Sequence, residues 1–170
     1  MTAQEVIDLL RLEPHPKEGG YFRETYRSRA SADAQHLPRG YAGARSLGTA
    51  IYYLLTPDTF SAMHRLPGDE IFHHYLGDTV EMLLLHEDER GEIVMLGGDL
   101  AASQRPQVVV PGGVWQGSRI APAAAGRSGF ALLGCTMAPG FDYADYAHGR
   151  RDELASRHPD HADRIRDLTP

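Results

Sequence analysis

The sequence predicts an all-β fold, a barrel or sandwich of antiparallel strands with a short helix at its start and short helices at its end. Between residues 21 and 137, short runs of β-branched and aromatic residues alternate with turns made of Gly, Pro and Asp. A helix signature precedes these runs, and helical composition follows them after residue 150. With 170 residues, of which 42% are hydrophobic, the chain has the size of one domain with one core. We therefore expect a single domain over residues 1–170.

The first helix is marked by Thr2 and Glu5, which stand three residues apart as in a capping box. Its apolar stripe consists of Val6, Ile7, Leu9 and Leu10. We expect this helix to end before Pro14 and to pack against the outside of the barrel. Residues 13–20, with two prolines and two glycines, predict a loop, and residues 21–27 alternate as a strand.

Residues 29–45 have no sustained period and are rich in Ala, Ser, Gly and charged residues. They predict a long surface loop or a flap over a pocket mouth. Residues 47–55 have a β-branched and aromatic centre, which is typical of a strand buried on both sides.

The central stretch, residues 60–81, carries the densest set of chemically active side chains. Successive side chains of a strand point to opposite faces, so Glu70, Phe72 and His74 share one face. His73 then lies on the opposite face, although a bulge would reverse this order. We expect His74 to face a pocket.

A second alternating run upstream contains His64, and Pro67-Gly68 favours a turn that brings the two runs back to back. This turn would set His64 near Glu70. A carboxylate beside an imidazole holds its tautomer and raises its basicity, and the imidazole titrates near neutral pH. The pair predicts machinery for moving a proton.

The remaining strands are expected at residues 80–86, 92–96, 107–110, 114–120 and 129–137. The first two of these form a hairpin around a polar turn. The single Cys135 lies in an apolar strand and is expected to be a buried structural thiol. After residue 150 we expect two short surface helices, in which His158 and His161 are solvated.

The charge pattern excludes two classes of partner. The net charge is −6 and no Lys/Arg run is present, which argues against nucleic acid and against an anionic membrane. No apolar run approaches the roughly 20 residues that cross a bilayer. We expect a cytoplasmic protein whose partner is a small molecule.

Four segments resemble a small single-domain family of the cupin superfamily (RmlC-like jelly roll) whose function is unsettled. They are EGGYFRETYRS at 18–28, HRLPGDEIFHHYLGD at 64–78, VVPGGVWQG at 109–117 and APGFDYADYAHG at 138–149. The resemblance spans most of the chain and implies a cupin double-stranded β-helix jelly roll. Such barrels hold an interior pocket lined by alternate strand residues.

The usual cupin metal ligands, three histidines and one glutamate, are only half present. His64 takes the place of the first histidine and Glu70 that of the glutamate, while Leu66 and Gln116 stand where two further histidines are usual. The resemblance therefore implies no firm cofactor. The alternative is a divalent transition metal held by His64, Glu70, His74 and Gln116.

The candidate catalytic residues are His64 and Glu70. The candidate ligand-binding residues are Arg23, Glu24, Phe72, His74, Trp115 and Gln116. Which of Arg23 and Glu24 faces inward stays open, and Trp115 can equally be a packing residue. An amide at position 116 offers both a donor and an acceptor to a ligand.

The leading functional hypothesis is a small-molecule pocket that performs acid/base isomerisation or epimerisation of a polar carbohydrate-like compound. Its rivals are a metal-dependent oxygenase or isomerase, and a metabolite-binding or sensor module without turnover. We also expect a homodimer formed through a sheet edge, because exposed edge strands otherwise invite uncontrolled association.

Overall fold

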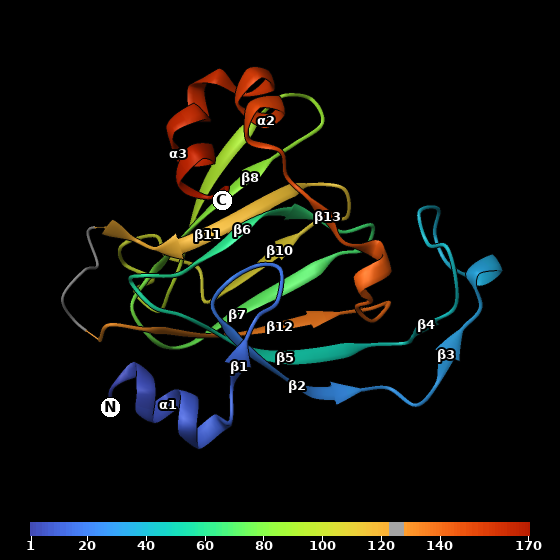
Figure 1. Ribbon diagram of the computed structural model, residues 1–170, viewed down its shortest axis with the longest axis horizontal. Helices are drawn as coiled ribbons and strands as arrows, with labels where there is room; N and C mark the ends of the chain where they lie inside the picture. Colours follow the sequence, from blue (N-terminus) through green and yellow to red (C-terminus); the bar gives the residue numbers. More distant parts are fainter. Residues whose placement is uncertain (123–127) are drawn as a thin grey trace.

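The computed structural model describes residues 1–122 and 128–170. Two antiparallel sheets face each other and enclose the core (Figure 1). The six-stranded sheet has the order β1 (Glu13–Pro14), β2 (Tyr21–Arg27), β5 (Thr49–Leu55), β12 (Ala131–Met137), β7 (Glu70–Gly77) and β10 (Gln107–Val110). The five-stranded sheet has the order β13 (Ala147–His148), β6 (Phe60–Arg65), β11 (Trp115–Ile120), β8 (Val80–Leu85) and β9 (Gly91–Leu96). The predicted all-β fold is confirmed.

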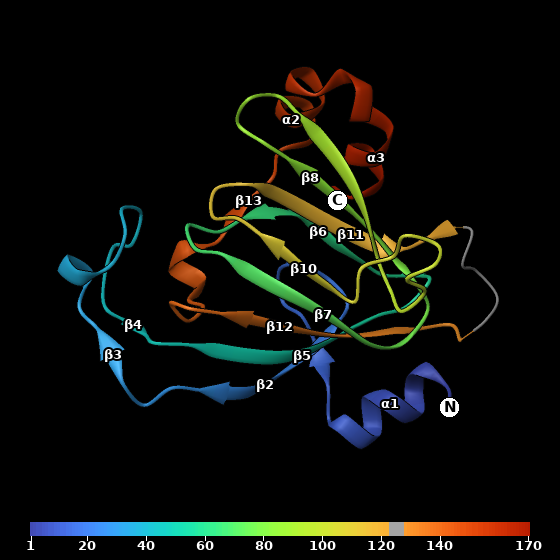
Figure 2. The same cartoon turned by 180° about the vertical axis from the view of Figure 1, so that it is seen from behind.

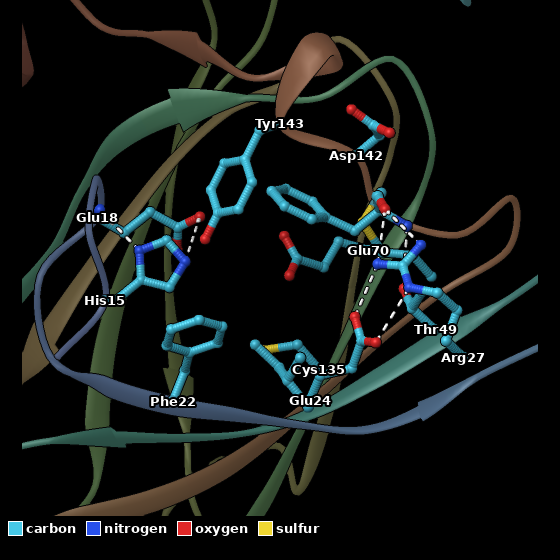
Figure 3. Close-up of a pocket in the computed structure, with 13 residues that line it drawn as sticks. His15, Glu18, Phe22, Glu24, Arg27, Thr49, Glu70, Cys135, Asp142 and Tyr143 are labelled. Carbon is cyan, nitrogen blue, oxygen red and sulfur yellow. Dashed lines mark hydrogen bonds and ion pairs between the residues drawn. The ribbon is translucent and has the colours of Figure 1, made fainter. Parts of the chain in front are cut away.

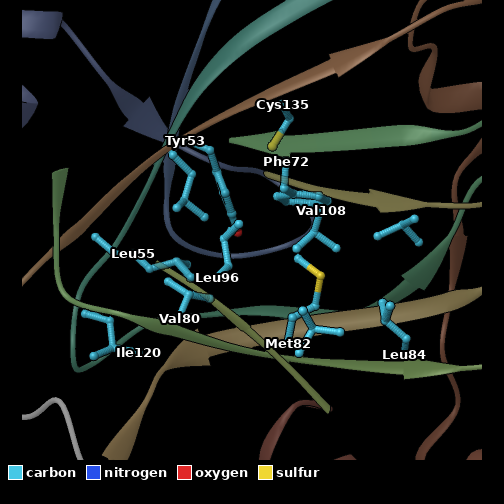
Figure 4. Close-up of a cluster of buried hydrophobic side chains, with 14 of the residues drawn as sticks. Tyr53, Leu55, Phe72, Val80, Met82, Leu84, Leu96, Val108, Ile120 and Cys135 are labelled. Carbon is cyan, nitrogen blue, oxygen red and sulfur yellow. The ribbon is translucent and has the colours of Figure 1, made fainter. Parts of the chain in front are cut away.

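Apolar side chains from both inner faces form the main core between the sheets (Figure 4). The alternating pattern of β7 places Phe72 inward, opposite Cys135 of β12 and Val108 of β10. Hydrophobic burial of this kind contributes about 25 cal/mol for each Å² of apolar surface removed from water. The core fills one part of the space between the sheets and leaves a cavity in another.

Helix α1 (Ala3–Leu10) begins with the predicted capping box. The Thr2 hydroxyl accepts a hydrogen bond from the backbone N–H of Glu5, and the Glu5 carboxylate accepts one from the backbone N–H of Thr2. The helix packs on the outer face of the six-stranded sheet, where its Val6 is buried against Leu54 and Leu132. Both the helix and its place outside the barrel are therefore confirmed.

Helices α2 (Arg151–Arg157) and α3 (Ala162–Asp167) flank a short 3₁₀ turn, η4 (Pro159–His161), and cover the outer face of the five-stranded sheet (Figures 1 and 2). Their buried residues are Leu154, Ile165 and Leu168, which pack on Met63, Leu83 and Leu85. His158 is only 2% exposed and donates from Nδ1 to the carbonyl of Glu89. The expectation of a solvated His158 is wrong, because the helices dock more tightly than their few apolar residues indicate.

The segment 29–45 carries more structure than a flap. It contains β3 (Ser31–Ala32), η1 (Ala34–His36) and the start of β4 (Arg45–Ser46), and β3 pairs with β4. The buried Arg45 forms an ion pair with Asp145 at 2.6 Å, which ties this segment to the C-terminal part of the chain. None of its residues lines the cavity described below.

Strands β6 and β7 are not paired with each other. The predicted back-to-back arrangement around Pro67-Gly68 is wrong, because β6 belongs to the five-stranded sheet and β7 to the six-stranded sheet. The turn carries the chain from one sheet to the other. His64 and Glu70 therefore approach each other across the interior of the sandwich.

Candidate functional site

A cavity of about 210 Å³ lies on the inner face of the six-stranded sheet (Figure 3). Four strands of the six-stranded sheet and two loops contribute its lining, so the site is built from both halves of the chain. The lining residues are His15, Glu18, Phe22, Glu24, Arg27, Thr49, Ile51, Glu70, Cys135, Met137, Phe141, Asp142 and Tyr143.

The turn between β1 and β2 brings Glu18 into this cavity. Two consecutive glycines follow it with positive φ, +91° at Gly19 and +67° at Gly20. A Cβ on Gly19 would lie 2.5 Å from the carbonyl oxygen of Phe60, and one on Gly20 would lie 2.7 Å from that of Leu54. Only glycine tolerates both the conformation and this close approach. The turn is further fixed because the Glu18 carbonyl accepts a hydrogen bond from the Ala62 N–H at 2.8 Å.

His64 presents one ring nitrogen to the acidic side chains of the site. The residue is 1% exposed, and its Nδ1 donates to the Ala62 carbonyl at 2.7 Å, which fixes the tautomer. Its Nε2 lies 3.8 Å from Glu18 Oε1 and 3.9 Å from Glu70 Oε2. The ring of Tyr146 stacks on the imidazole with centroids 5.2 Å apart. Among the described residues, Nε2 has no hydrogen-bond partner.

Gln116 orients Glu70 from the opposite sheet. It lies opposite His64 in the pairing of β11 with β6, and its Nε2 donates to Glu70 Oε2 at 2.8 Å. The Gln116 side chain is buried, and its Oε1 has no partner in the part of the chain that the structure describes. A buried amide oxygen without a donor is unfavourable, so a donor from a ligand or from water would stabilise it.

Burial and neighbouring charges shift the pKa values of Glu18, His64 and His15. Burial raises the pKa of Glu18 to about 7, an effect that Glu70 strengthens and His64 opposes. Burial alone would lower the pKa of His64, but the carboxylates of Glu18 and Glu70 outweigh it and raise this pKa to about 9. Burial, with smaller contributions from His64 and Lys17, lowers the pKa of His15 to about 4. Near neutral pH the site therefore holds an imidazolium beside a carboxyl group that is ready to exchange a proton.

A bulge in β2 sets which of its side chains reach the cavity. The pairing of β2 with β5 shifts between Glu24 and Tyr26, so that Arg27 joins Phe22 and Glu24 on the cavity side. Arg27 forms a two-pronged pair with Glu24, with N–O distances of 3.0 and 2.7 Å. Both nitrogens of its terminal fork also donate to the Phe141 carbonyl.

Four of the candidate residues lie at or directly behind the cavity: Glu24 and Glu70 line it, and His64 and Gln116 lie behind the lining next to Glu70. Arg23 lies outside the cavity lining, with its guanidinium over the ring of Tyr52. The question that the sequence left open is thus settled in favour of Glu24 as the inward residue.

The other three candidates lie elsewhere. Phe72 is part of the apolar core. His74 is half-buried, does not line the cavity, and bonds through Nε2 to the carbonyl of Asp78. Trp115 packs beneath the C-terminal helices with Arg65 over its ring, which corresponds to the packing alternative.

Sequence reasoning missed several members of the site, among them His15, Glu18 and Tyr143. Glu18 and the Gly19-Gly20 pair stand in the first of the four family segments, which is the signal that could have pointed to them. Cys135 lines the cavity and is buried, as expected of a structural thiol, and burial raises the pKa of its thiol well above the ordinary value.

The described side chains around His64 and Glu70 do not form a suitable set of ligands for a divalent transition metal. Within residues 1–122 and 128–170, no three His, Cys, Asp or Glu side chains are grouped so that they can hold an ion. Leu66 offers no ligand atom, and Gln116 turns its NH₂ group toward Glu70. We derive no chemical step through a metal.

A family model described as "Cupin superfamily (DUF985)" matches residues 4–148 of the chain. The chain belongs to this family. The cupin is 32% identical over 159 residues to the uncharacterized protein YML079W of Saccharomyces cerevisiae, covering 90% of this chain and 78% of the yeast protein.

Solved structures agree with this assignment. A hypothetical protein from Leishmania major superposes with a TM-score of 0.88 at 32% identity, covering 99% of both chains. Protein SO0799 from Shewanella oneidensis gives 0.84 at 32% identity, covering 100% of this cupin and 98% of that chain. Oxalate decarboxylase from Bacillus subtilis gives 0.53 at 13% identity over 92% of this cupin and 37% of that chain, which shows the cupin fold alone. No helix among the described residues is long and apolar enough to cross a membrane.

Proposed function

We propose that this cupin binds a small polar, carbohydrate-like molecule between its sheets and isomerises or epimerises it by acid/base catalysis. The observation that carries the proposal is the buried Nε2 of His64, which faces two carboxylates beside the cavity and has no partner among the described residues. Perturbed titratable groups that gather at a cavity are typical of catalytic sites.

Glu18 and His64 have complementary roles in this reaction. The Glu18 carboxylate takes a proton from the carbon next to a carbonyl group of the ligand, and the His64 imidazolium gives its Nε2 proton to the carbonyl oxygen. The product is an enediol held beside a neutral imidazole and a carboxylic acid. Return of the two protons, one to carbon and one to His64, completes the isomerisation and restores both groups. For epimerisation, the enediol turns its other face to Glu18 before the carboxylic acid returns the proton to the same carbon.

Glu70 and Gln116 support this pair. The Glu70 carboxylate stabilises the imidazolium of His64, and Gln116 fixes the carboxylate by a hydrogen bond of 2.8 Å. The cavity of about 210 Å³ is smaller than the roughly 300–1,000 Å³ of sites for drug-sized ligands. It is suited to a compound about as large as a single sugar.

The test is exchange of carbon-bound hydrogen with solvent. The protein is incubated with a panel of aldoses and ketoses in D₂O, and loss of the proton signal next to the carbonyl is followed by NMR. We expect exchange with the natural protein and a loss of roughly 100-fold or more in Glu18→Gln and His64→Gln, as for removal of a general base or acid. The control is Arg23→Gln, which lies outside the cavity lining and should exchange at the natural rate.

Three results would overturn the proposal. Exchange that Glu18→Gln and His64→Gln leave unchanged would place the chemistry elsewhere. A ligand retained through purification, identified by mass spectrometry and released unaltered, without exchange in any compound, would favour a binding or sensor module. Exchange that disappears on removal of a metal found by elemental analysis would favour the metal-dependent alternative.

A further inference from the structure

The lining of the cavity holds more acidic side chains than permanent cations. Among the described residues that line it, four are carboxylic acids and one is a permanent cation. The acids are Glu18, Glu24, Glu70 and Asp142. The cation, Arg27, is already held by both oxygens of Glu24 and by the Phe141 carbonyl, so it offers little attraction to an anionic ligand.

The two imidazoles do not reverse this excess. His15 accepts a hydrogen bond at Nδ1 from the Glu18 N–H, and burial holds its pKa near 4, so the ring is neutral at physiological pH. His64 is charged, but its Nε2 stands within 4 Å of both Glu18 and Glu70. Its positive charge is therefore balanced before a ligand arrives.

Aromatic faces at the rim already accept a cation. The Lys17 ammonium lies 5.1 Å from the ring centroid of Tyr143 and 5.3 Å from that of Tyr146. Phe22, Phe141 and Tyr143 add aromatic surface to the lining itself. Ammonium groups are attracted to such ring faces within about 6 Å.

A buried acceptor lies directly behind the lining, next to Glu70. Gln116 is 2% exposed and has no donor for its Oε1 within the described residues, while its NH₂ group is engaged by Glu70. An ammonium group has three donors and no acceptor, so it matches carboxylate and amide oxygens better than a hydroxyl group does.

We propose that the ligand of this cavity is an amine-bearing hydroxylated compound, of the amino sugar or amino alcohol class, and that the carboxylates of the lining reject anions such as sugar acids and sugar phosphates. This inference rests on the proposed function only in placing a small carbohydrate-like molecule in the cavity.

Calorimetric titration at pH 6.5 with three probes of similar shape tests the inference: glucosamine, glucose and glucuronate. Glucosamine should bind at least roughly tenfold tighter than glucose, a difference that one favourable charge contact supplies, and glucuronate should bind more weakly than glucose. Equal or weaker binding of glucosamine relative to glucose, including the absence of binding by all three, would overturn the inference.

Glu24→Gln gives a second test within the same fold. The change removes one carboxylate and releases Arg27 from its two-pronged pair, so the preference for glucosamine over glucuronate should fall by roughly tenfold. Arg23→Gln, the neighbouring change outside the cavity, should leave the preference unaltered. An unchanged preference in Glu24→Gln would contradict the assignment of selectivity to the lining.

The two proposals fail separately. Proton exchange on neutral sugars without preference for the amine would remove this inference and leave the acid/base proposal standing. Selective amine binding with no exchange in any compound would leave this inference standing and remove the catalytic one.

Discussion

His64 gains its proton affinity from two carboxylates that tertiary folding brings to one ring nitrogen. Glu18 lies before four intervening strands, β2 to β5, and Glu70 comes from the other sheet. Their charges outweigh the effect of burial on the pKa of the imidazole. This arrangement has consequences for stability as well as for chemistry, because a shifted pKa links folding to pH.

The stability that His64 contributes should fall as pH rises. Its pKa is raised from 6.5 to about 9 in the folded state, so the contribution is complete below pH 6.5 and disappears as pH passes through 9. The shift corresponds to at most about 3 kcal/mol. Urea unfolding at pH 6 and pH 9 should show this loss in the natural protein, whereas His64→Gln should retain only the pH dependence that comes from the raised pKa of Glu18. A difference between the two proteins that is independent of pH would contradict the assignment.

Gln116 should contribute to stability through Glu70. Gln116→Leu removes the hydrogen bond of 2.8 Å and leaves a carboxylate oxygen without its donor, which should lower the free energy of unfolding by about 1–3 kcal/mol. Urea unfolding measures the change, with Arg23→Gln expected within about 0.5 kcal/mol of the natural protein. A neutral effect of Gln116→Leu would mean that water replaces the amide.

The turn between β1 and β2 places Glu18, one of the residues that sequence reasoning missed, in the cavity. Gly20→Ala would put a methyl group 2.7 Å from the Leu54 carbonyl at a backbone φ of +67°. We expect a loss of about 1–3 kcal/mol in unfolding free energy, together with weaker ligand binding as Glu18 shifts. Gly98→Ala is the matched control, since its Cβ meets nothing within 4 Å and φ there is not positive. Equal effects of the two changes would show that the turn tolerates side chains.

The C-terminal helices are held by few but fully buried side chains. Leu154 is 1% exposed and packs on Met63 and Leu85 of the five-stranded sheet. Leu154→Ala should therefore lower the free energy of unfolding by about 2–5 kcal/mol. The exposed Leu9 of α1 provides the comparison, and Leu9→Ala should change it by less than about 0.5 kcal/mol. If the two changes were equally mild, the helices would be only loosely docked.

Strand positions were predictable because they depend on local pattern. The period-two alternation and the Gly, Pro and Asp turns place β2, β5 and β12 within two residues of their observed bounds. The side of the sheet to which each side chain points was less predictable, because β-bulges change it without any clear sign in the sequence. The shift in β2 turns Arg27 toward the cavity, and a second shift lies between β12 and β7 beyond His74.

The site itself depends on contacts between distant parts of the chain. The sequence correctly placed His64 near Glu70, but it did not indicate that the two strands lie in different sheets. It could not place Glu18 or Tyr146 at His64, because each comes from a loop whose path is set by tertiary packing. The family segments marked both loops without indicating their roles.

We propose that the complete protein is a homodimer. The edge strand β10 pairs with β7 on one side only, as Figure 2 shows from behind, and its Val109 is 51% exposed. Such an edge favours association with a second copy. Light scattering at micromolar concentration should give twice the mass of one chain. A monomeric mass would contradict the proposal.

The proposed chemistry depends on the charge coupling between His64 and Glu18, and NMR titration of the His64 imidazole measures this coupling directly. We predict an apparent pKa near 9 in the natural protein, well above the ordinary 6.5, and a decrease of about one unit or more in Glu18→Gln, where only Glu70 and the Ala62 carbonyl oppose burial. A titration near 6.5 that Glu18→Gln leaves unchanged would contradict the account, because the imidazole would then not hold its proton between the two carboxylates.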